Sequence, residues 1–317
     1  MIGMSMDQHQ RANVTSGVGL TAITAAAARA VESSRPDRLL DDPLATAFVA
    51  AANTATPLPV RWPDRDAALS DREILLLHGS GYVGLRTRFG DDELRHACLT
   101  GAGQVVVLAA GLDTRAFRID WPEGVRLFEI DLPSMLEFKD EVLREQGAVA
   151  RCARTAVAVD LREDWTSALA DAGFDAGSPS VWLAEGLLQY LSAGAERALF
   201  ERIHDLSAPG SHLVVERTVN IAALVEGDNG QRLREISERT GIAMDQLLDT
   251  EARPDPAAWL AERGWTVTEH PVATIAQRYG RDLRNPGLPR PSRSPTAAPG
   301  SRPAAARGGL SFLCARR

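Results

Sequence analysis

The stretch V-V-V-L-A-A-G-L-D-T-R, residues 105–115, runs from a continuous apolar segment directly into a turn that contains Gly111. Such a run before a glycine is typical of a buried strand that ends in a tight turn. In open α/β sheets, ligands bind beyond the carboxyl ends of the strands, and a glycine there lets a ligand approach the backbone. The stretch therefore predicts a sheet strand, followed either by a cofactor site above Gly111 or by a plain turn.

Short apolar runs alternate with amphipathic segments from residue 104 onward. Alternation of strands and helices predicts a mainly parallel sheet covered on both faces, and the late runs leave room for one antiparallel strand. We therefore expect an α/β fold with a doubly wound, seven-stranded, mostly parallel sheet. The predicted strands are 105–108, 126–130, 155–159, 181–184, 212–215, 266–269 and 310–315, and the predicted helices are 134–146, 165–172, 195–207 and 256–263.

The flanking segments predict additions to this core. Residues 1–100 predict an N-terminal helical cap, with helices at 20–32, 43–52, 71–78 and 91–99. The core itself is expected at 101–219 and 255–317, interrupted by a polar, helical lid at 220–254. Residues 284–309 are rich in Pro, Arg, Ser and Ala, a composition that buries too little apolar surface to order itself, so we expect a mobile loop there.

Composition narrows the function. The chain has 317 residues, 44% of them hydrophobic, and a net charge of −7, which argues against a nucleic-acid partner. Its three scattered cysteines lack the spacing of a metal site or a disulfide framework, which predicts no metal and a reducing compartment. No apolar run reaches the ~20 residues of a membrane span, so we expect a cytoplasmic protein without a membrane partner. No pattern indicates an oligomeric state.

Two further predicted strands end in acidic residues. Asp131 follows Gly111 by 20 residues, an offset at which a carboxylate can accept hydrogen bonds from ribose hydroxyls. Glu129 points to the same side of its strand and is a lesser candidate. At the end of the third strand, Asp160 can accept from an adenine amino group and the Leu161 backbone can bond the ring edge. Either aspartate can instead be an ordinary turn or helix-cap residue.

The turn sequence favours one nucleotide cofactor over another. A dinucleotide pyrophosphate needs G-x-G-x-x-G at a helix start, whereas residues 109–115 read A-x-G-x-D-T-R. The glycines are too few, and Asp113 would repel a pyrophosphate. S-adenosylmethionine has no phosphate, and its positive sulfonium and amino-acid end are compatible with an aspartate. The turn thus favours S-adenosylmethionine over NAD, which makes an NAD-dependent oxidoreductase the weaker alternative.

Four segments in this order resemble the leucine carboxyl methyltransferase-like family of S-adenosylmethionine-dependent O-methyltransferases, most closely its bacterial branch associated with natural-product genes. The likeness covers nearly all of residues 17–280 and the last strand. It implies a class I, Rossmann-like methyltransferase that acts in secondary metabolism on a small-molecule carboxylic acid or polyketide-like acceptor. The segments are G-V-G-L-T-A-I-T-A-A-A-A-R-A-V-E-S-S-R-P-D-R-L-L-D-D-P-L-A (17–45), Q-V-V-V-L-A-A-G-L-D-T-R-A-F-R (104–118), F-E-I-D-L-P (128–133) and W-L-A-E-G-L-L-Q-Y-L (182–191).

The resemblance also implies roles for matching positions. Arg86 pairs with the cofactor carboxylate, with Arg88 as its rival, because a guanidinium fork matches a carboxylate. Glu185 faces the cofactor's amino-acid end or its methyl group. Apart from the resemblance, Tyr190 follows Glu185 by five residues and either touches the acceptor or only packs. The remaining positions are the turn around Gly111, with Ala109 and Asp113, at the methionine end; Asp131 at the ribose; and Asp160 with Leu161 at the adenine.

One position departs from the family pattern. The family usually has Gly-Ala-Gly where this chain has Ala109-Ala110-Gly111. If position 109 needs a positive φ, alanine costs about 1 kcal/mol or more. If it needs only a small side chain, the fit to the methionine is slightly tighter. Ala109 is also the one hint for a further alternative, a cofactor-binding protein that has lost catalysis and serves a partner enzyme.

The acceptor decides which catalytic groups are needed. A carboxylate is ionised at neutral pH, since its ordinary pKa is about 4, and therefore needs no base. A phenol or alcohol needs one, and the histidines are the candidates by type alone. Basic side chains can hold an acidic substrate or form ordinary salt bridges, and Lys139 is expected to be solvated. The histidines are His78, His204, His212 and His270, and the basic side chains are Arg29 and Arg217.

Overall fold

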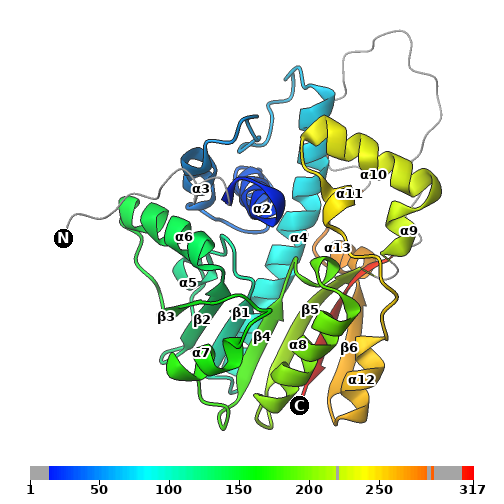
Figure 1. Ribbon diagram of the computed structural model, residues 1–317. Coiled ribbons are helices and arrows are strands. Elements are labelled where there is room, and N and C mark those ends of the chain that lie inside the picture. The colour runs from blue at the N-terminus through cyan, green and yellow to red at the C-terminus, as the bar shows by residue number, and fades with distance from the viewer. Residues whose placement is uncertain (1–13, 219–220, 284–286, 289–308) are drawn as a thin grey trace.

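A seven-stranded sheet forms the centre of the computed structural model, which describes residues 14–218, 221–283, 287–288 and 309–317 (Figure 1). The strand order is β3-β2-β1-β4-β5-β7-β6, so the order reverses between β1 and β4. Only β7 is antiparallel, and it lies between β5 and β6. The predicted fold class is confirmed, with strands β1 (Gln104–Leu108), β2 (Arg126–Asp131), β3 (Ala153–Ala158), β4 (Ser180–Ala184), β5 (His212–Thr218), β6 (Thr266–Pro271) and β7 (Leu310–Arg316).

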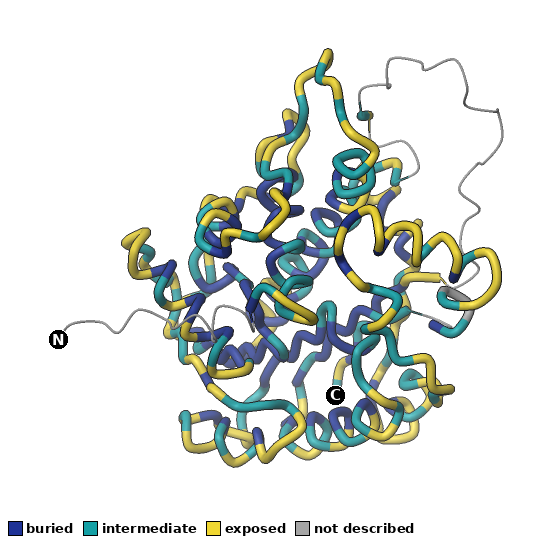
Figure 2. Tube along the Cα trace, turned by 45° about the horizontal axis from the view of Figure 1, so that its top comes forward, coloured by how far each residue is buried: buried dark blue, intermediate teal, exposed yellow. Residues whose placement is uncertain are grey.

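Helices cover both faces of the sheet, which explains why the central strands read as unbroken apolar runs. Along β1, Val106 and Leu108 pack into one core with α7, α8 and α12, while Val105 and Val107 pack into the other with α4 and α13. In Figure 2 the central strands are correspondingly the most buried part of the trace. The helices of these layers are α4 (Asp71–Leu99), α5 (Arg115–Arg118), α7 (Trp165–Asp171), α8 (Ala193–Asp205), α12 (Pro256–Glu262) and α13 (Val272–Arg278), with a 3₁₀ turn η1 (Leu188–Tyr190) after β4.

Helix α4 is a single helix of 29 residues, so the prediction of two separate helices at 71–78 and 91–99 is wrong. Ser70 and Glu73 form a capping box at its start. The residues between the predicted helices include four glycines, which are poor helix formers. Close packing against the adjacent helix overrides that tendency. At Gly84 only a glycine fits, since a Cβ there would lie 2.6 Å from Glu32 Cγ. Arg86 and Arg88 therefore lie within a helix rather than in a loop.

Two groups of helices lie beyond the carboxyl ends of the strands. On one side, α2 (Gly17–Ser33) and α3 (Ala45–Ala52) pack with α6 (Pro133–Glu145) in a third apolar cluster. On the other, α9 (Ala222–Val225), α10 (Gly227–Thr240) and α11 (Met244–Leu247) follow β5, and α10 contacts α4 (Figure 1). These last three helices occupy the stretch predicted as a lid.

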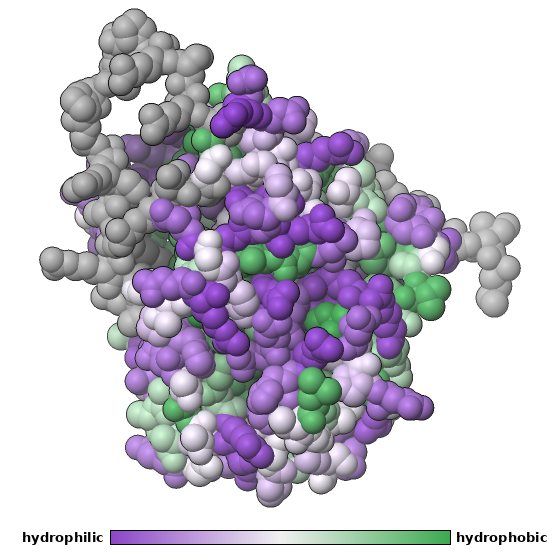
Figure 3. Space-filling view, turned by 180° about the vertical axis from the view of Figure 1, so that it is seen from behind, coloured by the Kyte–Doolittle hydropathy of each residue, from purple (hydrophilic) through white to green (hydrophobic). Residues whose placement is uncertain are grey.

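The surface is mostly hydrophilic in the view from behind, where apolar patches are small and separate (Figure 3). Across the described ranges, no helix combines the length and apolarity that crossing a membrane requires. The loop predicted at 284–309 lies outside the described residues, apart from 287–288 and Gly309.

Candidate functional site

A cavity of about 940 Å³ lies above the carboxyl ends of β1, β2, β4 and β5. This is the edge where strand order reverses and where open α/β sheets bind ligands. Its volume is at the upper end of the ~300–1,000 Å³ typical of ligand pockets. The structure brings together nine of the residues predicted for the site, all of which line this cavity: Arg86, Ala109, Gly111, Asp113, Asp131, Asp160, Leu161, Glu185 and Tyr190.

The turn after β1 is fastened to the end of β2 by Asp131. Gly111 N–H donates to Asp131 Oδ2 at 2.6 Å, and Leu132 N–H donates to Asp131 Oδ1 at 2.7 Å. Helix α2 approaches this turn closely, since a Cβ at Gly111 would lie 3.3 Å from Ala22 Cβ. Asp131 therefore fixes the backbone at the cavity floor and is itself one of the residues that line the cavity.

Ala109 has a φ of +49°, one of two non-glycine residues in the left-handed region within the described chain. A side chain in this conformation costs about 1–2 kcal/mol. The turn thus does need a positive φ at position 109, and the departure from glycine is strained.

We expect Ala109→Gly to raise the free energy of unfolding by about 0.5–1 kcal/mol, because relief of strain outweighs the entropy that glycine adds to the unfolded chain. Urea denaturation measures the change. Ala110→Gly is the matched control: Ala110 is buried and has no left-handed backbone, so this change destabilises the protein. If both variants lose stability equally, strain at Ala109 is refuted.

Arg115 is the centre of a buried ionic cluster beside the cavity. Its side chain is 2% exposed. Nε donates to Asp91 Oδ1 at 2.7 Å, Nη2 donates to Glu185 Oε2 at 2.7 Å, and Nη1 pairs with Asp113. Burial alone would raise the pKa of Asp113, but Arg115, Lys139 and Arg118 lower it to about 2. Burial likewise opposes ionisation of Glu185, yet Arg115 and Arg86 leave its pKa below the usual value. Both groups are therefore carboxylates at neutral pH.

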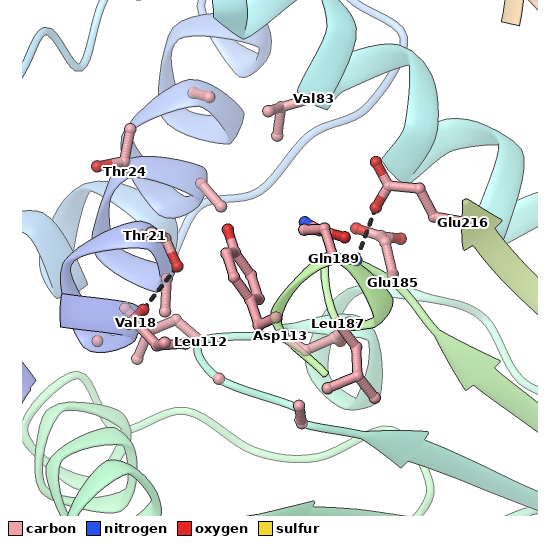
Figure 4. Close-up of a pocket in the computed structure, with 18 of the residues that line it drawn as sticks. Val18, Thr21, Thr24, Val83, Leu112, Asp113, Glu185, Leu187, Gln189 and Glu216 are labelled. Carbon is pink, nitrogen blue, oxygen red and sulfur yellow. Dashed lines mark hydrogen bonds between the residues drawn. The ribbon is translucent and has the colours of Figure 1, made fainter. Parts of the chain in front are cut away.

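Arg86 presents a second guanidinium to the cavity, on a side chain that is 14% exposed. Its Nη1 lies 3.0 Å from Glu216 Oε2 and its Nε lies 3.2 Å from Glu185 Oε1. Nε is buried and makes no hydrogen bond to the described residues. Glu216 also accepts from Tyr82 O–H and from Gly186 N–H, the latter at 2.6 Å. Figure 4 shows Glu185 and Glu216 side by side, both reaching toward the cavity.

Arg115 and Glu216 are not among the site residues that the sequence pattern predicts. Glu216 follows the predicted strand 212–215 directly, so its place at a strand end is a usable signal. Arg115 lies in the quoted stretch itself, but its burial depends on Asp91, which is distant in sequence.

Two predicted site residues lie elsewhere. Arg88 pairs with Asp92 at 3.1 Å and its side chain is 43% exposed, because residues two apart on a helix point about 200° apart. Glu129 is fully buried and accepts from Lys139 Nζ at 2.7 Å and Arg154 Nε at 2.9 Å. Glu129 points to the same face of β2 as Asp131, but it lies two residues before the end of the strand and beneath α6. Lys139 is thus buried, and the expected solvated position is wrong.

The remaining candidates divide between the cavity and other parts of the molecule. Asp160 accepts a hydrogen bond from Arg162 N–H at 2.8 Å. It is not the cap of α7, because Asp164 occupies that position. Arg29 lines the cavity but pairs with Asp42 at 2.8 Å, and Arg217 pairs with Asp255 outside the cavity. No histidine is present among the described lining residues: His78, His204, His212 and His270 all lie elsewhere.

The charges of the cavity fit a cationic ligand that also carries a carboxylate. A pyrophosphate would meet Asp113 and Asp131 at the turn, where Gly111 N–H already donates to a carboxylate. A sulfonium and an ammonium group are attracted by the same side chains, and the guanidinium of Arg86 suits a carboxylate. The described residues contain no cluster of metal-ligating side chains. These features fit S-adenosylmethionine and oppose a dinucleotide.

Comparison with known proteins agrees with this geometry. Residues 22–204 match the family model described as leucine carboxyl methyltransferase. A protein of Saccharopolyspora erythraea classed as an S-adenosyl-L-methionine-dependent methyltransferase is 46% identical over 278 residues, covering 88% of this chain and 93% of that protein. One from Rhodococcus jostii in the same class is 43% identical, covering 87% of this chain and 92% of its own. The crystal structure of a DUF574 family protein from Streptomyces avermitilis shares the fold, with a TM-score of 0.50, 13% identity, and coverage of 90% of this chain and 98% of that one.

Proposed function

The chain belongs to the leucine carboxyl methyltransferase family and is an S-adenosylmethionine-dependent methyltransferase, and we propose that it methylates an oxygen of a small-molecule carboxylic acid. The prediction of S-adenosylmethionine rather than NAD is confirmed, as is that of an enzyme. One observation carries the proposal: the described lining residues include no histidine, lysine or cysteine. A carboxylate acceptor, already ionised, is the oxygen nucleophile that needs none of them.

We assign the chain's own residues to the cofactor as follows. S-adenosylmethionine supplies, when bound, an electrophilic methyl group on a positively charged sulfur. Asp131 would hold the ribose, Asp160 and Leu161 the adenine, and the turn at Gly111 the methionine. Arg86 would take the cofactor carboxylate and Glu185 the amino group. Arg115 acts indirectly: it keeps Glu185 ionised and oriented through its bond at 2.7 Å.

The protein's contribution to the reaction would be alignment and exclusion of water. Holding the acceptor oxygen in line with the methyl group replaces a bimolecular encounter, an effect worth up to about 7–11 kcal/mol in ideal cases. Helices α2, α10 and α11 enclose the cavity from above and would keep water out. Tyr190, on η1, lines the cavity with its hydroxyl 4.0 Å from Met244 Sδ on α11, and it would contact the acceptor. We place the reaction in secondary metabolism on the strength of the branch that the four sequence segments resemble.

The test is a turnover assay against a panel of carboxylic acids and phenols, with product masses measured. We expect acids to gain one methyl group as an ester. The rate should be independent of pH above about pH 6, because carboxylates are fully ionised there, whereas a phenol, with a pKa of about 10, would react faster as pH rises. Methylation of phenols alone, or a rate that climbs toward pH 9, would contradict a carboxylate acceptor.

A further inference from the structure

The cavity is divided into a charged floor and an apolar roof. Its carboxylates come from the strand ends, whereas the lining residues of α10, α11 and the segment around them carry no charge. On α2 the one charged lining residue, Arg29, is paired with Asp42. The uncharged roof consists of Val18, Thr21, Ala22, Thr24 and Ala25 on α2, Leu75, Leu76 and Val83 on α4, and Leu233, Ile236, Ile242, Met244 and Leu248 in the lid.

The apolar roof continues to the surface. Six large apolar side chains are exposed in the described chain, and four of them line this cavity: Val18 and Ile236 in the roof, Leu132 directly after β2, and Leu310 at the start of β7. The surface seen in Figure 3 is mainly hydrophilic by comparison. Exposed apolar side chains gathered at a cavity are typical of a site for an apolar ligand. Because the cofactor residues are on the charged floor, this roof is left for the acceptor.

Gln189 links the roof to the floor. Its side chain extends into the cavity beside Glu185 and Glu216 (Figure 4). None of the hydrogen bonds between described residues involves its side-chain amide. The neighbouring carboxylates are already engaged by Arg115, Arg86 and Gly186. Its backbone is held by the lid, since Asp249 N–H donates to Gln189 O at 2.9 Å. An amide N–H₂ with no partner suits an acceptor carboxylate.

We propose that the acceptor is an amphiphilic carboxylic acid whose carboxylate is held by the Gln189 amide and whose apolar body fills the roof between α2, α4 and the lid. This inference rests on the proposed function. The acceptor oxygen forms a bond to the methyl carbon while the bond between that carbon and sulfur breaks. The electron pair of the broken bond stays on sulfur. The negative charge of the acid and the positive charge of the sulfonium cancel, so no proton moves. The products are a neutral ester and S-adenosylhomocysteine.

Substrate series test the apolar roof. We would measure kcat/KM for linear and aryl-substituted monocarboxylic acids of increasing apolar area, with α,ω-dicarboxylic acids of matched length as controls. Each buried methylene should raise kcat/KM about fourfold until the roof is full, and dicarboxylic acids should be poor substrates. If kcat/KM does not depend on apolar area, or is as high for dicarboxylic acids as for monocarboxylic acids, the acceptor is not amphiphilic. The proposal of a carboxylate acceptor would be unaffected by that result. If no acid of any series is methylated, the proposed function itself fails.

Variants at Gln189 test the polar contact. Gln189→Met keeps the volume but removes the donor, and should lower kcat/KM for acids about tenfold or more. Gln189→Glu should lower it further by repelling the carboxylate. Leu99→Gln, on an exposed residue outside the cavity, is the control. S-adenosylmethionine affinity and melting temperature should stay unchanged in all three, which separates acceptor binding from a structural role. Full activity in Gln189→Met or Gln189→Glu would remove Gln189 from the acceptor site.

Discussion

Arg115→Met should lower the free energy of unfolding by about 3–5 kcal/mol, the range for breaking a buried ion pair by removing one partner. The Arg115 side chain is 2% exposed and holds Asp91, Asp113 and Glu185. Methionine fills similar space without the charge, so the carboxylates would lose their main counterion inside the protein. Glu185 would also lose the contact that orients it toward the cavity.

Urea denaturation of the two matched variants measures this effect. Arg88→Met is the control, because its pair with Asp92 is exposed and such pairs are worth about 0–1 kcal/mol. Arg115→Lys keeps the positive charge but makes fewer hydrogen bonds, so its loss in free energy of unfolding should lie between those of Arg115→Met and Arg88→Met. Equal losses in Arg115→Met and Arg88→Met would show that the buried cluster adds nothing specific.

The same cluster predicts a pH dependence. The pKa of Asp113 is lowered to about 2 in the folded protein, against 3.8 for an unperturbed aspartate. Its ionised form therefore stabilises the fold above pH ~4, and that contribution is lost as pH falls toward 2. In Arg115→Met, most of this loss of stability between about pH 4 and pH 2 should disappear, because the lowered pKa of Asp113 depends on the Arg115 guanidinium.

Asp131→Ala should weaken S-adenosylmethionine binding by about 10-fold to 150-fold, which corresponds to the 1.5–3 kcal/mol of a hydrogen bond to a charged group. The change removes the acceptor assigned to the ribose and also releases Gly111 N–H and Leu132 N–H from the carboxylate. Both effects disorder the floor against which the cofactor would lie. Isothermal titration with S-adenosylmethionine gives the affinity directly.

Two comparisons sharpen the Asp131 result. Asp131→Asn keeps one oxygen acceptor and should bind better than the alanine variant, while Arg88→Met should bind as the unchanged protein does. Burial raises the pKa of Asp131. As pH falls, the affinity for S-adenosylmethionine should therefore begin to decline at a higher pH than it would with an ordinary aspartate. Unaltered affinity in Asp131→Ala would exclude this residue from the site.

The strands were predictable because each central strand is buried on both faces, which leaves a continuous apolar run such as residues 105–108. Helix α4 was not predictable as one helix, because its glycines have low helix propensity and the close packing of Gly84 against Glu32 is not visible in the local sequence. Local pattern ranked Asp131 above Glu129 but could not exclude Glu129 from the site. The two share a strand face, and the difference is whether the residue lies beyond the sheet edge or under α6.

Residues whose roles depend on distant partners stay hidden in the sequence. Arg115 is defined by Asp91 and Glu185, and Arg86 by Glu216, at separations of 24 to 130 residues. The place of Gln189 in the cavity is apparent only in the folded chain, where the segment after α11 contacts η1 through the hydrogen bond from Asp249 N–H to Gln189 O. Motif order located the floor of the cavity, whereas its roof required the three-dimensional arrangement of α2, α4 and α10.

The most direct measurement is a crystal structure of the protein soaked with S-adenosylmethionine. We expect the adenosine between Asp131 and Leu161, the methionine carboxylate on Arg86, and the methyl group directed toward Gln189 and Tyr190. A cavity that stays empty, is closed by its own side chains, or holds the cofactor away from Gly111 and Asp131 would contradict the site described above.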